Sequence, residues 1–99
     1  MTENITHTNK PEECYIDYID SIVETCNNEY YMSAIGPPLG NLERAKRGRL
    51  RILESILELK KIDEKVSCLA CHQEIQKQIN LQRNGVLEIE TVWKLKSEL

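Results

Sequence analysis

Helical spacing of apolar residues dominates this chain between residues 41 and 84. The stretch contains no proline and one glycine, Gly48, and its aliphatic side chains recur every three or four residues. Asn41 is a good N-cap, so we expect a helix to begin directly after it. Arg49 interrupts the apolar face. The face itself is formed by Leu42, Ala45, Ile52, Ile56 and Leu59, and is widened by Leu50, Leu53 and Leu57.

An earlier helix is predicted from about Pro11 or Glu12 to Ser33. Pro11 suits the first turn of a helix, and Glu12 and Glu13 complement the positive end of the helix dipole. The paired prolines and two glycines of residues 36–40 cannot continue this helix. Its buried stripe is expected to consist of Ile16, Ile19, Val23, Cys26 and Tyr30.

Two interpretations are open around residues 60–63. Lys60 and Lys61 suit a helix C-terminus and Asp63 suits an N-cap, which together predict a tight turn and a third helix from Glu64 to about Gln82. A single long helix is the alternative. We favour the turn, because one helix of more than forty residues would leave its apolar face uncovered unless it dimerised.

The last part of the chain is harder to assign. Asn84 and Gly85 predict a turn. Residues 86–99 are compatible with a strand or with a helix, and we favour a helix from about Glu88.

These elements predict an all-α fold, a small bundle of three to four helices in one domain. The chain has 99 residues and no phenylalanine, so its core is small and mainly aliphatic. Residues 1–11 are polar and are expected to form a disordered tail, which leaves residues 12–99 as a single helical domain. A homodimer, or another partner, would supplement a core of this size.

Charge is segregated along the sequence. The net charge is −3, but residues 1–40 hold seven acids and one base, whereas residues 41–61 hold seven bases and three acids. The concentration of bases in residues 41–61 suits an anionic partner, either phosphate groups or an acidic protein surface. A solvated face that pairs with Asp17, Asp20 and Glu24 is the alternative. The candidate binding residues are Arg44, Lys46, Arg47, Arg49 and Arg51.

A cysteine and histidine cluster is the second candidate site. Cys68, Cys71 and His72 match the C-x-x-C-H pattern of haem attachment, and they share a helical face that could supply three zinc ligands. A fourth ligand would have to come from Cys14 or Cys26. Because no secretory signal is evident, we expect a cytoplasmic protein with reduced cysteines, no metal and no cofactor.

These observations lead us to expect a binding protein rather than an enzyme. The leading prediction is a small helical adaptor or regulator that binds another protein, itself included. The first alternative is a nucleic-acid-binding regulator that uses residues 44–51, and the second is a zinc- or redox-responsive protein that uses Cys68, Cys71 and His72. No apolar stretch approaches the roughly 18 residues of a membrane span, so no membrane partner is expected.

Overall fold

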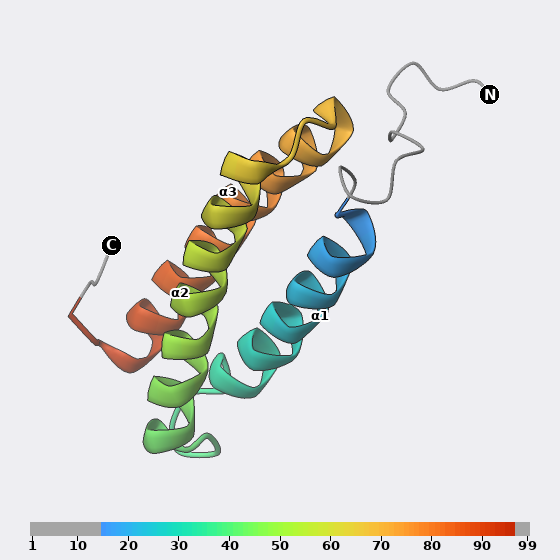
Figure 1. Cartoon of the computed structure of the whole chain (residues 1–99). Helices are drawn as coiled ribbons and strands as arrows, with labels where there is room; N and C mark the ends of the chain where they lie inside the picture. Colours follow the sequence, from blue (N-terminus) through green and yellow to red (C-terminus); the bar gives the residue numbers. More distant parts are fainter. Residues whose placement is uncertain (1–14, 97–99) are drawn as a thin grey trace.

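The computed structural model describes residues 15–96, which fold into three helices: α1 (Ile16–Ser33), α2 (Leu42–Lys65) and α3 (Leu69–Trp93). Consecutive helices run in opposite directions and pack along their lengths (Figure 1). No strand occurs in this part of the chain, so the all-α prediction is confirmed, with three helices. The expected tail and the start of the first helix lie outside the described residues.

The loop between α1 and α2 matches the sequence-based prediction. α1 ends at Ser33, and the proline-rich segment separates it from α2. The Asn41 side chain accepts a hydrogen bond from the backbone N–H of Arg44 at 2.9 Å, which confirms Asn41 as the N-cap of α2. Trp93 closes this end of the bundle, because its indole N–H donates to the carbonyl of Ser33 at 2.8 Å.

The connection between α2 and α3 lies later than predicted. α2 continues to Lys65, and residues 66–68 form the turn. Asp63 is therefore inside α2, and its predicted role as an N-cap is wrong. Val66 and Cys68, on the turn itself, are both buried in the core. Burial of these two side chains places the reversal of the chain after Lys65.

The predicted turn at Asn84 and Gly85, and a separate helix from Glu88, are also wrong. α3 passes through both residues without a break. A helical glycine costs about 1 kcal/mol relative to alanine, whereas full burial of an aliphatic side chain contributes about 1.5–3 kcal/mol. Val86 and Ile89 follow directly and are both fully buried. Tertiary packing therefore outweighs the local turn signal.

The core lies along the inner faces of all three helices. Of the residues predicted to be buried, Ile52, Ile56 and Leu59 lie in it, and Val23 packs against them at the edge. Ile75 of α3 is fully buried in the same core. Leu50 and Leu57, which were expected to widen the buried face of α2, are instead more than half exposed.

Candidate functional site

The basic side chains at the start of α2 pair with acids on three different helices. The guanidinium of Arg44 forms an ion pair with Glu29 of α1, with Nη1 and Oε1 separated by 2.7 Å. Arg49 reaches the other way and pairs with Glu90 of α3 at 3.3 Å. Lys46 lies 3.9 Å from Glu43 on the exposed surface of the same helix. The acids that pair with the segment are therefore not the expected Asp17, Asp20 and Glu24.

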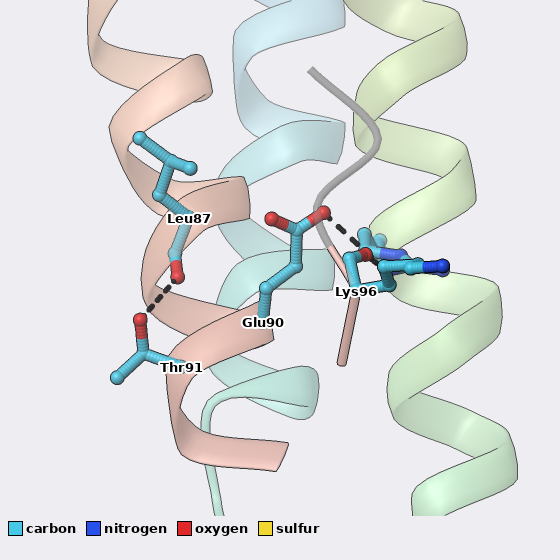
Figure 2. A network of polar contacts seen from close by, with 5 residues as sticks. Leu87, Glu90, Thr91 and Lys96 are labelled. Carbon is cyan, nitrogen blue, oxygen red and sulfur yellow. Dashed lines mark hydrogen bonds and ion pairs between the residues drawn. The ribbon is translucent and has the colours of Figure 1, made fainter. Parts of the chain in front are cut away.

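Arg49 also holds the end of the chain that follows α3. Its Nη1 donates to the backbone carbonyl of Lys96 at 3.2 Å, and Figure 2 shows Glu90 and Lys96 lying beside each other. Lys94 adopts a left-handed conformation with φ of 56°, and the N–H of Leu95 donates to the carbonyl of Glu90. This arrangement is a Schellman motif, and it turns the chain back so that the carbonyl of Lys96 faces α2.

The ion pair between Arg49 and Glu90 is largely buried. The Arg49 side chain is 15% exposed and that of Glu90 is 4% exposed. Removing one member of such a pair leaves a buried charge without its counter-ion and is strongly destabilising. Arg49 is therefore a structural residue, although its position in the sequence had made it a candidate for binding.

Arg47 and Arg51 remain exposed on the side of α2 that faces away from the core. With Arg44 they line an open groove of ≈ 470 Å³ between α1 and α2. The same groove contains Glu29, Glu54 and the exposed side chain of Leu50. It therefore combines both signs of charge with an apolar surface.

A second open groove continues along α2 toward its C-terminus. It shares Glu54 with the first groove and contains Leu57, Lys61 and Lys65 of α2, together with Tyr18 of α1. Leu50 is 55% exposed and Leu57 is 58% exposed, so each groove holds one leucine that the fold does not cover. The two grooves form one continuous surface along α2.

Two tyrosines of α1 form hydrogen bonds to carboxylates of the neighbouring helices. The hydroxyl of Tyr18 donates to Glu58 of α2, and that of Tyr30 donates to Glu88 of α3 at 2.7 Å. Each hydrogen bond to a carboxylate favours the protonated phenol and raises the pKa of its tyrosine above the usual value. Tyr30 also lines an open groove between α1 and α3, beside Tyr31, Leu81 and Gly85.

The cysteine and histidine cluster lies at the turn between α2 and α3. Cys68 and Cys71 are buried in the core, whereas Nδ1 of His72 lies 2.5 Å from Oδ1 of Asp63. Gln76 donates to the other oxygen of Asp63 at 3.0 Å. Among the residues that the structure describes, no three His, Cys, Asp or Glu side chains are grouped so that they could hold a metal ion. Cys14, one candidate fourth ligand, lies outside them.

The other candidate fourth ligand, Cys26, is buried in the core on α1. Desolvation raises the pKa of its thiol, which disfavours the thiolate that binds metals and acts as a nucleophile. The structure therefore places the described cysteines as core residues.

Comparison with protein-family models, with curated proteins and with solved structures found no match. Within residues 15–96, none of the three helices combines the length and the apolar character that a bilayer-spanning helix requires.

The exposed leucines of α2 are the feature that sequence reasoning assigned wrongly. The sequence does contain a pattern that includes these leucines, because five residues of α2 repeat at spacings of three, four, three and four. In the structure all five are exposed. We call this set the α2 stripe; it consists of Arg47, Leu50, Glu54, Leu57 and Lys61.

Proposed function

We propose that this chain is a small helical protein that acts by binding another protein through the α2 stripe. The observation that carries the proposal is that Leu50 and Leu57, seven residues apart in adjoining grooves, are each more than half exposed. Single exposed leucines are ordinary on protein surfaces. Two leucines one heptad apart within a repeat of three and four residues are typical of a face that packs against a partner helix.

The charges around the leucines favour a protein partner over nucleic acid. Glu29 and Glu54 line the same groove as Arg44, Arg47 and Arg51, and Glu58 lines the next one. Carboxylates repel the phosphate backbone, which dominates the affinity of proteins for nucleic acids. Two of the five bases of the segment also pair with acids of α1 and α3. Exposed apolar side chains bordered by polar and charged residues instead match the apolar core and polar rim of a protein interface.

The zinc- or redox-responsive alternative has less support. A zinc site at this turn would need the imidazole of His72 together with the thiolates of Cys68 and Cys71. The imidazole of His72 faces Asp63 instead, and both thiols are buried among aliphatic side chains.

Site-specific photo-crosslinking in cells that express the full chain tests the proposal. A photoreactive phenylalanine analogue replaces Leu57, and the matched control carries it at Leu87, an exposed leucine of α3 that lies outside the stripe. We expect a discrete adduct at position 57 that is missing at position 87 and is lost when Leu50 is replaced by Glu. Identical adducts at both positions, or none at position 57, would contradict the proposal.

A further inference from the structure

The α2 stripe carries its charges in a definite order. Arg47, Glu54 and Lys61 are positive, negative and positive, and the two leucines lie between them. In heptad terms the charged residues occupy one core position and the leucines occupy the other. All five side chains are exposed, so this order is presented to any helix that packs along the grooves. It determines which partner helices fit.

A second copy of the stripe fits poorly in parallel orientation. When two parallel helices pair in register, each core position meets its own equivalent. The leucines would then meet leucines, but Arg47 would face Arg47, Glu54 would face Glu54 and Lys61 would face Lys61. Three like-charge contacts at the centre of an interface oppose its formation.

A second copy fits no better in antiparallel orientation. If Leu50 of one copy faces Leu57 of the other, Arg47 comes opposite Lys60 and Lys61 comes opposite Lys46. If the copies shift so that the leucines of one copy face the charged core positions of the other, Leu50 faces Glu54 and Leu57 faces Arg47. Each register therefore brings together like charges or buries a charge against a leucine, which requires desolvation without a counter-ion.

A parallel pair shifted by one heptad would match charges, since Arg47 would face Glu54 and Glu54 would face Lys61. This contact is not symmetric, so it leaves an unpaired half-stripe on each copy and adds further copies without closing. It also uses only part of the stripe.

We infer that the α2 stripe is complementary to a partner helix that presents acid, leucine, base, leucine and acid at matching spacing, and that it selects against a second copy of this chain. This inference rests on the proposed function. An acid opposite Arg47, a base opposite Glu54 and an acid opposite Lys61 pair every charge while both leucines are covered. Arg51 flanks the stripe on the side of the groove that also holds Arg44, and it favours further acids on the partner.

Two designed helical peptides test the complementarity. They have the same sequence except at the three charged positions that would face the stripe. The first carries acid, leucine, base, leucine and acid, and the second carries base, leucine, acid, leucine and base, which repeats the order of the stripe. Binding to the full chain is measured by fluorescence anisotropy of a labelled peptide. We expect the first peptide to bind at least tenfold more tightly, a difference that corresponds to 1.4 kcal/mol.

Reversing the charges of the stripe supplies the decisive control. The triple variant Arg47→Glu, Glu54→Arg and Lys61→Glu should exchange the preference, so that the second peptide binds more tightly. Leu50→Glu together with Leu57→Glu should abolish binding, whereas Leu87→Glu should leave it unchanged. Equal binding of both peptides, or no binding of either, would overturn the inference. The crosslinking experiment at position 57 is independent of this result, so the proposed function would still stand or fall separately.

Sedimentation velocity of the full chain tests the selection against self-pairing. We expect either a monomer at micromolar concentration or an association that the two leucine substitutions do not alter, since such an association would use another face. A dimer or a longer assembly that Leu50→Glu and Leu57→Glu dissociate would overturn this part of the inference.

Discussion

Gly48 of α2 and Ser33 of α1 lie so close together that no side chain fits between them. A Cβ atom on Gly48 would lie 1.9 Å from Oγ of Ser33 and 3.2 Å from the carbonyl oxygen of Glu29. Both residues are buried, so the crossing of α1 and α2 depends on a glycine at this position.

Replacing Gly48 by alanine is therefore expected to destabilise the protein. Alanine gains about 1 kcal/mol in helix propensity, but crowding in a packed interior costs typically about 1–3 kcal/mol, with larger costs for severe overlap. We expect the loss from overlap to exceed the gain, and urea denaturation followed by circular dichroism measures the difference. Gly85→Ala is the matched control, because its Cβ would lie 3.3 Å from the ring of Tyr30 and should be better tolerated. Equal stabilisation by both substitutions would contradict the close crossing.

The second prediction concerns the ion pair between Arg49 and Glu90. Arg49→Met removes the cation that pairs with the buried carboxylate of Glu90 and should cost about 3–5 kcal/mol in unfolding free energy. Replacing both residues by methionine should cost much less, because no uncompensated charge remains. Arg51→Ala, at an exposed position of the same helix, should change stability by less than about 0.5 kcal/mol. A double variant as unstable as Arg49→Met would refute the argument from buried charge.

The third prediction separates the inner face of α2 from the α2 stripe. Ile56 is buried in the core and its neighbour Leu57 is mostly exposed. Ile56→Ala should cost about 2–5 kcal/mol, whereas Leu57→Ala should have little effect on the stability of the isolated protein. Chemical denaturation of both variants measures the difference. A loss below about 0.5 kcal/mol for Ile56→Ala would place that residue on the surface and overturn the bundle.

The fourth prediction is a dependence on high pH through Tyr30. Its hydroxyl donates to Glu88, and this bond, together with burial and the charge of Glu88, raises the pKa of Tyr30 in the folded state. The unfolded tyrosine has a pKa of about 10. The folded state is therefore stabilised below pH 10, and this contribution is lost as the pH rises through the higher folded pKa.

Ultraviolet titration of tyrosinate tests this prediction most directly in a Tyr18→Phe background, because the pKa of Tyr18 is also raised. Glu88→Gln should lower the pKa of Tyr30 toward its ordinary value. An unchanged titration curve in this variant would show that the hydrogen bond between α1 and α3 does not form in solution.

The sequence by itself determined the features that depend on local chemistry. The end of α1 at Ser33 and the start of α2 after Asn41 follow from paired prolines, flexible glycines and a side chain that caps a helix. Paired prolines oppose a continuous helix by about 3 kcal/mol or more each, so packing elsewhere does not outweigh this signal. The inner face of α2 likewise follows from helical periodicity, since Ile52, Ile56 and Leu59 must lie on one side of any helix.

Only the tertiary structure decided where weak local signals gave way to packing. The lysines before Asp63 and the glycine at position 85 each favour a break by about 1 kcal/mol or less. Burial of Val66 and Cys68 at one turn, and of Val86 and Ile89 in α3, contributes more and sets the actual boundaries.

The roles of the charged and apolar residues on α2 were also decided in three dimensions. Arg44 and Arg49 look alike in the sequence, but Glu29 and Glu90, which pair with them, come from two other helices. Leu50 and Leu57 look like core residues, yet neither α1 nor α3 covers them. Periodicity shows which residues share a face of a helix, but whether that face is buried depends on where the other helices pack.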